Sequence, residues 1–227
     1  MPTPIQLLVG PQTAADGTTP TARGGRSGEG IIQQLHGRFY EANFRGTLFS
    51  DGMGLTSINA ATFTSGTLGA TCTPIAGVWN PSTNTVNLVI LQVALGVTLT
   101  ALQATGAGPY VWASSVGNTA LTLGNAPLNR KTQAAVGSNA KGLAGIALTG
   151  LTNNLVVRGA AALGGGAIYS ASLLGTAAGF VPPMISNLDQ IEGAIIVPPG
   201  GVLALLATTT PVAHSASSSL VWEEVAT

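Results

Sequence analysis

The chain has 227 residues, of which only 7% are charged, and its eight acidic and eight basic side chains leave no net charge. Globular domains average about 25% charged residues, and a folded monomer of this length exposes roughly 9,500 Å² of surface, or roughly 600 Å² for each charge. Because nucleic-acid binding needs clustered Lys or Arg and the sequence has no such cluster, we expect no nucleic-acid partner.

The scarcity of charge also bears on self-association. A neutral surface lacks the repulsion that keeps monomers apart, so much of it is expected to be buried against copies of the chain or against a host lattice. The alternative is a surface made soluble by Thr, Ser, Asn and Gly without charge. Cys72 is the single cysteine, which excludes an intrachain disulfide, and we expect it in the core.

Two segments were considered for membrane targeting. The N-terminal sequence MPTPIQLLVG has no basic residue before its short apolar run, so we expect no secretory signal and assembly in a cytoplasm. The most apolar stretch, Val86 to Leu102, is short for a membrane span and contains Asn87, Gln92, Thr98 and Thr100. A buried strand explains it better, and we expect no membrane partner.

The N-terminal part is expected to be an extended arm. Gly, Thr, Pro and Arg dominate the segment from Gly10 to Gly30, which has scarcely a large apolar residue. We assign residues 1–35 to the arm and residues 36–227 to the body. Arg23 and Arg26 would then lie on a flexible element suited to an acidic groove, with a disordered tail as the alternative. Ile31 to Leu35 could be a short helix or strand.

Beyond the arm, runs of Thr, Val, Leu and Ile separated by Gly, Pro and Asn predict an all-β fold. Two turns are clear: Asn80 to Asn84, and Pro198 to Gly201, where prolines end one strand and glycines allow reversal. Many short strands with such turns indicate a jelly-roll-like antiparallel β-sandwich. The expected strands are Phe44–Phe49, Ile58–Phe63, Ala70–Trp79, Val86–Leu99, Val111–Ser115, Gly145–Leu148, Asn154–Arg158, Ile191–Val197, Val202–Ala207 and Ser219–Val225. The Gly- and Ala-rich stretch from Leu163 to Gly179 is expected to be a surface connection or an oligomer contact.

Residues that could support catalysis do not form a recognisable set. The sequence GRSGEG resembles a nucleophile elbow around Ser27, but Glu29 stands where a glycine is needed and no strand precedes it. His36 and Glu41 could be an acid–base pair, although His36, Arg38, Tyr40 and Arg45 are better explained as an anchor between arm and body. His214 is expected in an exposed loop. We therefore expect no enzyme, no cofactor and no metal site.

The C-terminal sequence SSSLVWEEV predicts a strand. Side chains alternate on a strand, so Trp222 shares a face with Leu220 and Glu224, whereas Glu223 lies on the other face with Val221 and Val225. The two glutamates cannot form one acid–base pair, and we expect one of them at an interface. Trp222 is expected to be buried as part of the sheet or of a subunit interface.

Two segments resemble a family of tailed-bacteriophage virion proteins. They are HGRFYEANFRGTLFS, from His36 to Ser50, and EGAIIVPPGGVLALLATTT followed by SSSLVWEEV, from Glu192 to Val225. The resemblance covers both ends of the body, and the middle is only generally similar. It implies a jelly-roll-like trimer on a phage particle, and proteins of this size in that family include capsid cement and decoration proteins.

The resulting hypothesis is a virion protein that binds the outer face of the major capsid protein as a homotrimer, with Arg23, Arg26, Arg38 and Arg45 binding capsid carboxylates. The main alternative is a tail or head-fibre protein that binds a host glycan through exposed aromatic residues. Trp79, Tyr110 and Trp112 are the candidates, although they are better explained as core or interface residues. An esterase or lyase of phage tails is the third, but no serine or carboxylate cluster supports it.

Overall fold

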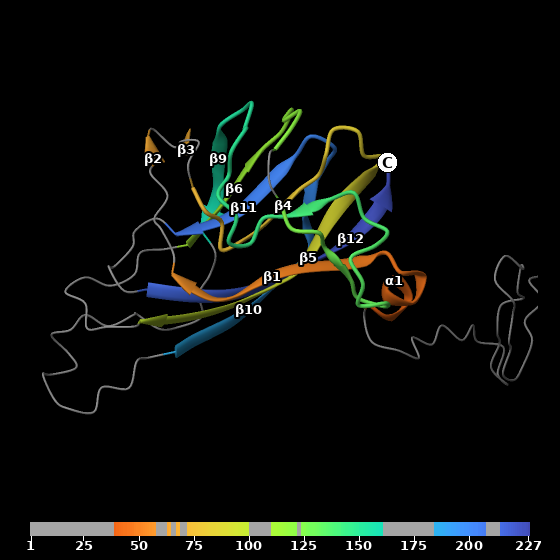
Figure 1. The fold of residues 1–227 in the computed structure, drawn as a ribbon, viewed down its shortest axis with the longest axis horizontal. Coiled ribbons are helices and arrows are strands. Elements are labelled where there is room, and N and C mark those ends of the chain that lie inside the picture. Colours follow the sequence, from red (N-terminus) through yellow and green to blue (C-terminus); the bar gives the residue numbers. More distant parts are fainter. Residues whose placement is uncertain are drawn as a thin grey trace, which may run out of the picture. The chain divides into compact units, whose positions relative to one another are not determined.

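The computed structural model describes residues 39–57, 63–64, 67–68, 72–99, 110–121, 124–160, 184–207 and 214–227 (Figure 1). The chain separates into two units, Met1–Tyr40 and Glu41–Thr227, and only Phe39 and Tyr40 of the first are described. The expected arm, with Arg23, Arg26 and Ile31–Leu35, lies outside the described residues, as do His36 and Arg38 of the expected body and the stretch Leu163–Gly179. The boundary between arm and body stays a prediction.

Nearly all of the regular secondary structure in the described part of the chain is strand. Its elements are α1 (Tyr40–Arg45), β1 (Leu48–Ser57), β2 (Phe63–Thr64), β3 (Thr67–Leu68), β4 (Ala76–Trp79), β5 (Val86–Leu99), β6 (Tyr110–Ser115), β7 (Leu128–Asn129), β8 (Lys141–Gly142), β9 (Leu155–Ala160), β10 (Met184–Val197), β11 (Val202–Ala207) and β12 (His214–Ala226). Several of the strands are rich in Val, Leu and Ile, the residues that suit a pleated and half-buried surface.

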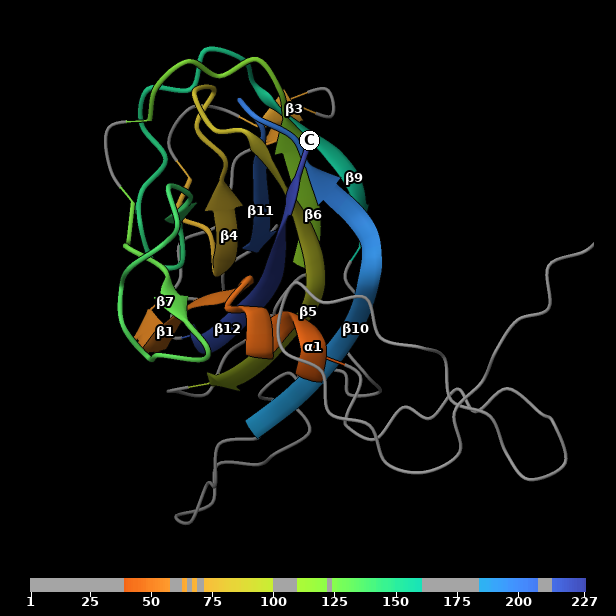
Figure 2. The same ribbon diagram turned by 90° about the vertical axis from the view of Figure 1, so that its right-hand side faces the viewer.

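The strands form two packed antiparallel sheets (Figures 1 and 2). The five-stranded sheet has the order β10-β5-β12-β1-β7, and the seven-stranded sheet has the order β2-β3-β9-β6-β11-β4-β8. The chain passes from one sheet to the other at each step from β4 to β5 to β6 and again from β10 to β11 to β12. The predicted all-β sandwich is confirmed, whereas the jelly-roll connectivity and the N-terminal arm stay predictions.

The predicted strands agree with the structure most closely where the apolar runs are long. Val86–Leu99 and Val202–Ala207 coincide with β5 and β11. The polar segment before Ser219 pairs along β5, so β12 begins at His214 and the prediction of a loop there was wrong. β10 likewise begins at Met184, before the predicted Ile191.

Other strand predictions failed for local reasons. Phe44 and Arg45 belong to α1, which ends at Arg45 and is followed by Gly46 in the left-handed conformation. The predicted strand Phe44–Phe49 is therefore confirmed only from Leu48. Gly145–Leu148 forms a loop because Gly145 also has a positive φ and its NH bonds to the Pro74 carbonyl. Within the predicted strand Ala70–Trp79, the structure describes the chain from Cys72, and of these residues Ala76–Trp79 form strand. Most of Ile58–Phe63 lies outside the described residues.

The main core lies between the inner faces of the two sheets. Trp222 has no exposed surface and packs there with Leu220, as their shared face predicts. Along β5 the buried alternation changes phase at Leu91, where the pairing with β12 contains a bulge between Val221 and Trp222. The other core residues on the long strands are Phe49, Leu88, Ile90, Val93, Leu95, Val97, Tyr110, Trp112, Leu203 and Leu205.

A second core covers the outer face of the seven-stranded sheet. There Trp79, Val111 and Ala113 pack with β11 side chains and with residues that include Cys72, Leu121, Leu143 and Leu148. Every residue of β4 and β11 is buried as a result. This sheet is therefore covered on both faces over its central strands.

Two turns at one end of the sandwich are joined by a buried asparagine. Asn80 has no exposed surface, and its side-chain amide donates to the carbonyls of Val86 and Val197 at 2.8 and 3.0 Å. The Gly200 NH bonds to the Asn80 carbonyl, and Gly200 adopts a φ of 76°. The predicted turns at Asn80–Asn84 and Pro198–Gly201 are confirmed, and they support one another.

We predict that Trp222→Ala lowers the free energy of unfolding by about 3–5 kcal/mol, because the substitution leaves a large cavity between the sheets. Urea unfolding followed by circular dichroism would measure this loss. Val225→Ala is the control on the same strand, since Val225 is exposed, and should change the value by less than about 0.5 kcal/mol. Equal midpoints for both variants and the parent would show that β12 does not hold the sandwich together.

Candidate interaction surface

The five-stranded sheet is buried along its inner face and only in part on its outer face, where Leu48 and Val221 are buried at one end. On β5, buried Val93, Leu95 and Val97 alternate with the partly exposed Gln92, Ala94 and Gly96. On β12 the buried Ala216 and Leu220 lie on the core side, and Ser217 and Ser219 lie on the other. No described segment covers this outer face as Leu121–Leu151 covers the other sheet.

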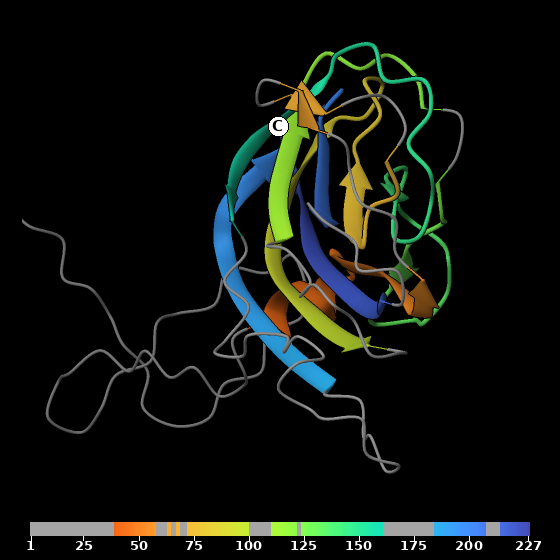
Figure 3. The same cartoon turned by 90° about the vertical axis from the view of Figure 1, so that its left-hand side faces the viewer.

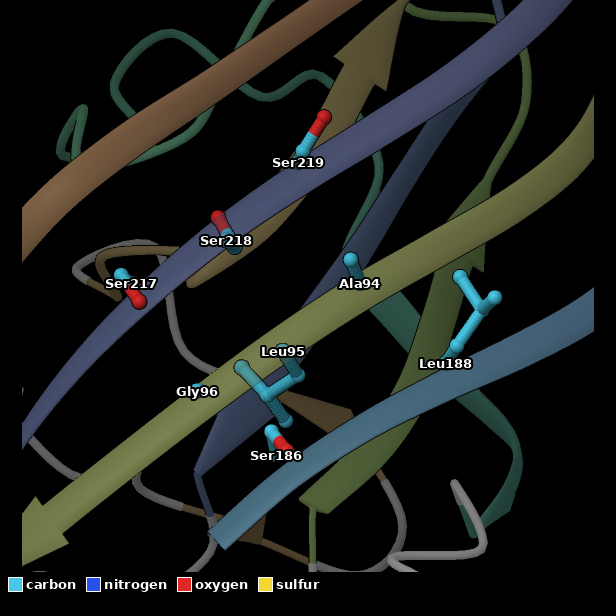
Figure 4. Close-up of a pocket in the computed structure, with 8 residues that line it drawn as sticks. All are labelled: Ala94, Leu95, Gly96, Ser186, Leu188, Ser217, Ser218 and Ser219. Atoms are coloured by element: carbon cyan, nitrogen blue, oxygen red, sulfur yellow. The ribbon is translucent and has the colours of Figure 1, made fainter. Parts of the chain in front are cut away.

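A shallow hollow of about 750 Å³ crosses the outer face over β10, β5 and β12 (Figure 4). The pairing places Ser186, Gly96 and Ser217 in one row and Leu188, Ala94 and Ser219 in the next, all on this face. Small side chains make the hollow: a Cβ at Gly96 would come within 2.8 Å of the Ser217 hydroxyl. None of its lining residues carries a formal charge.

Both edges of this sheet are partly open. Among the described strands, β10 pairs only with β5, so one side of its backbone has no strand partner (Figures 2 and 3). At the opposite edge β7 pairs only with Phe49 and Ser50 of β1. The segment Gly52–Ser57 pairs with β12 on one side and has no described strand on its other side. Leu188 on β10 is 53% exposed and Leu55 on β1 is 62% exposed.

The edge strand β10 is interrupted by a bulge. Its register with β5 shifts between Gln190 and Ile195, and Glu192 and Gly193 have φ values of 55° and 86°. A glutamate in the left-handed region is uncommon and costs conformational energy. The bulge divides β10 into two parts. Met184–Gln190 pairs with β5 in continuous register, and Ile195–Val197 forms a short second part.

Basic residues gather at the opposite edge, beside β7. Arg45 ends α1, Arg130 and Lys131 follow β7, and all three are exposed. The Lys131 ammonium donates to the Phe44 carbonyl at 2.6 Å and lies 4.9 Å from the centre of the Phe44 ring.

Asn129, a buried residue of β7, fixes the segments around these basic residues. Its side-chain amide donates to the Gly46 carbonyl at 2.7 Å, and its side-chain oxygen accepts from the NH groups of Lys131 and Thr132 at 3.0 and 3.3 Å. The Arg130 NH bonds to the Leu48 carbonyl. The turn after β7 is thereby bound to the start of β1.

Asp51 is held in a polar niche on β1. Its carboxylate accepts from the Asn125 side chain at 3.2 Å and from the Ala144 NH at 3.1 Å. Gly142 lies so close that a Cβ there would be 2.1 Å from this carboxyl group, so the position requires glycine. Burial raises the pKa of the Asp51 carboxyl above its usual value, against the lowering effect of these hydrogen bonds.

The two adjacent glutamates have different surroundings, as the strand alternation predicts. Glu223 accepts a hydrogen bond from the Thr47 hydroxyl at 3.3 Å. Glu224 accepts one from the Ser138 hydroxyl, and burial raises the pKa of the Glu224 carboxyl. Both glutamates thus fasten β12 to segments of the same chain, and a role of either in an interface stays a prediction.

The aromatic residues considered for a glycan site do not form one. Trp79, Tyr110 and Trp112 are buried, Tyr110 and Trp112 in the main core and Trp79 in the second core. Burial also raises the pKa of Tyr110 and, to about 11, that of Cys72, which lies in the second core as predicted. The interpretation of these aromatic residues as core residues is therefore confirmed, and the alternative that they form a glycan site is contradicted.

Of the residues predicted from the sequence as binding or interface residues, the structure describes five. Tyr40 and Arg45 are the exposed ends of α1, Trp222 is in the core, and Glu223 and Glu224 fasten β12. Sequence reasoning missed the open sheet face, although the alternation of Gln92, Ala94 and Gly96 with Val93, Leu95 and Val97 was a usable signal. It also missed Asn129 and Asn125, whose roles depend on contacts distant in the sequence.

Within the described ranges, no three His, Cys, Asp or Glu side chains come together as metal ligands would. The described residues likewise include no helix with the length and apolar character of a membrane span. Comparison of the chain with protein-family models, with curated proteins and with solved structures gave no match.

In the parent protein, ionisation of Asp51 and Glu224 is expected to lower the free energy of unfolding as pH rises. We predict that a double variant, Asp51→Asn with Glu224→Gln, does not show this decrease. A carboxyl group with a raised pKa in the folded state stabilises the fold below its usual pKa, and this contribution is lost as pH rises through the raised pKa. The urea midpoint of the double variant relative to the parent should therefore be higher at pH 7 than at pH 4.5. An equal difference at both pH values would contradict these assignments.

Proposed function

We propose that the chain is a structural protein of a bacteriophage particle, a capsid cement or decoration protein that self-associates as a homotrimer and binds the outer face of the major capsid shell. The observation that carries this proposal is the uncovered face of the five-stranded sheet, which is neutral around its hollow and ends in two open edges. Such a surface suits burial against another protein, at about 25 cal/mol for each Å² of apolar area.

The strand order supports a jelly roll as the form of the sandwich. Without the short strands, the sheets read β10-β5-β12-β1 and β9-β6-β11-β4. Eight strands arranged as two Greek keys define the jelly roll, an architecture of viral capsid and lectin domains. Fold alone does not assign a role, so the proposal rests also on the scarcity of charge and on the resemblance of the terminal segments to phage virion proteins.

In this proposal the arm attaches the trimer to the shell. Residues 1–35 contain Arg23 and Arg26, and Arg38 and Arg45 follow close behind. Arginine binds carboxylates through two parallel hydrogen bonds, which suits an acidic groove between capsid subunits. The particle is assembled in the bacterial cytoplasm, and no cofactor or nucleic acid is part of this function.

The self-association part of the proposal predicts a stable trimer in solution. Multi-angle light scattering of the purified chain should give three times the mass of one chain across a tenfold dilution. The capsid part predicts hundreds of copies in each particle, measured by quantitative mass spectrometry of the virion. A few copies would place the protein in the tail or in fibres, and a stable monomer at high concentration would contradict the trimer.

The role of the arm leads to a separate prediction. Deleting residues 2–30 removes few large apolar side chains, those of the short run from Ile5 to Val9, so the thermal unfolding midpoint should change by less than about 3 °C. The same deletion should abolish binding to particles that lack the protein, measured by co-sedimentation. The control is a chain in which only Arg23 and Arg26 are replaced by Gln, which should bind more weakly but measurably. Unchanged binding by the deleted chain would contradict the role of the arm.

A further inference from the structure

We infer that the copies associate head to tail, with the free edge of β10 in one copy pairing with the free edge of β1 in the next. The inference deepens the proposed function and depends on its self-association part. It concerns the segment Met184–Gln190 of β10 and the segment Gly52–Ser57 of β1. Each has a strand on one side only among the described residues, and an unpaired strand edge is a template for pairing with another chain.

The direction of the strands suits this arrangement. Each pairing between β10, β5, β12 and β1 is antiparallel, so β10 and β1 run in opposite directions. Rotation about an axis along the strands preserves their direction, and β10 of one copy therefore meets β1 of the next in an antiparallel pair. Contacts between two different surfaces of this kind generate rings when the rotation closes.

The two segments also lie at the same position along the strand direction of the sheet, which is called their height below. Met184 pairs with Thr98, Thr98 with Ser215, and Ser215 with Ser57, so the start of β10 is level with the end of β1. At the other end of the segments, Asp189 is level with Asp51 through Val93 and Leu220. The two open edges therefore lie at the same height and have nearly the same length.

Apolar exposure marks the same two segments. Leu188 and Leu55 are among the exposed large apolar side chains of the described residues, and each lies on one of the open edges. Gly54, beside Leu55, has no atom within 4 Å of a Cβ added to it, so a neighbouring strand can approach this part of β1 closely. Pairing would cover both leucines and would extend the hollow at Ser186 and Leu188 across the boundary between copies.

The charges favour this pairing over a symmetric one. The open edge of β10 carries Asp189 and Glu192, whereas basic Arg130 follows β7 at the opposite edge of the sheet. Glu192 lies between the levels of Asp51 and Phe49, and Asn129, next to Arg130, pairs with Phe49. The head-to-tail pair brings two carboxylates, Asp189 and Asp51, to the same level. Pairing of two β10 strands about a twofold axis would bring four carboxylates together, and like charges on paired strands are destabilising.

Cysteine cross-linking tests the inference directly. Single variants would carry Cys at Ser186 or Leu188 on β10, or at Gly54 or Thr56 on β1, and double variants would combine one position from each strand. Buried Cys72 stays in every chain as a common background. After mild oxidation we expect covalent dimers and trimers from at least one double variant, and no cross-link from any single variant, because a disulfide needs Cα atoms about 4.4–6.8 Å apart.

A substitution that does not depend on exact register completes the test. Leu188→Asp should raise the dissociation constant of the assembly by about tenfold or more. Val116→Asp is the matched control, because Val116 is also 53% exposed but lies beyond the end of β6, outside the segments Met184–Gln190 and Gly52–Ser57, and it should leave the assembly unchanged.

The possible results separate this inference from the proposed function. Dimers from a single β10 variant would overturn it in favour of twofold pairing, and a trimer without any cross-link would overturn it in favour of another surface. A monomeric parent chain would overturn both the inference and the self-association. Cross-linked trimers that fail to bind the capsid would support the inference and reject the capsid role.

Discussion

The architecture depends on which sheet faces are removed from water. The inner faces of both sheets bury one another around Trp222, and the segment from Leu121 to Leu151 buries the outer face of the seven-stranded sheet. Around its hollow, the outer face of the five-stranded sheet has no comparable cover among the described residues, although Leu48 and Val221 are buried farther along this face. Small and uncharged side chains occupy that face around its hollow, so it remains compatible with water and equally compatible with a close protein contact.

The loops follow from a second physical requirement, which is that buried backbone groups need hydrogen-bond partners. Asn80, Asn118 and Asn129 are buried, and each bonds to backbone groups of two different segments. Asn125 does the same at lower burial by joining Asp51 to the Ala144 carbonyl. Asparagine supplies both donors and an acceptor without a charge, which explains how loops with so few ionic groups can be ordered.

The sequence predicted the class of fold because period-two alternation and turn residues are local signals. It placed β5, β11 and the two turns closely, and it placed Cys72 and Trp222 in the core. It could not predict that β12 extends back to His214, since a serine-rich strand is stabilised by its pairing with β5 and not by its own composition. It left Trp79, Tyr110 and Trp112 between the core and a glycan site for a related reason, because which face of a strand is covered depends on segments that are distant in the sequence. The open face and its two edges become visible only when the strand order is known.

The central claim is that the free edge of β10 is paired in the assembled protein. Residue-resolved amide hydrogen exchange measures this directly, because the NH groups of Met184–Gln190 that point away from β5 have no strand partner in the isolated chain. The account predicts that these amides are protected in the assembly to the same degree as those of β5, and that dilution to the monomer removes their protection while β5 stays protected. Rapid exchange of these amides in an intact assembly would contradict it.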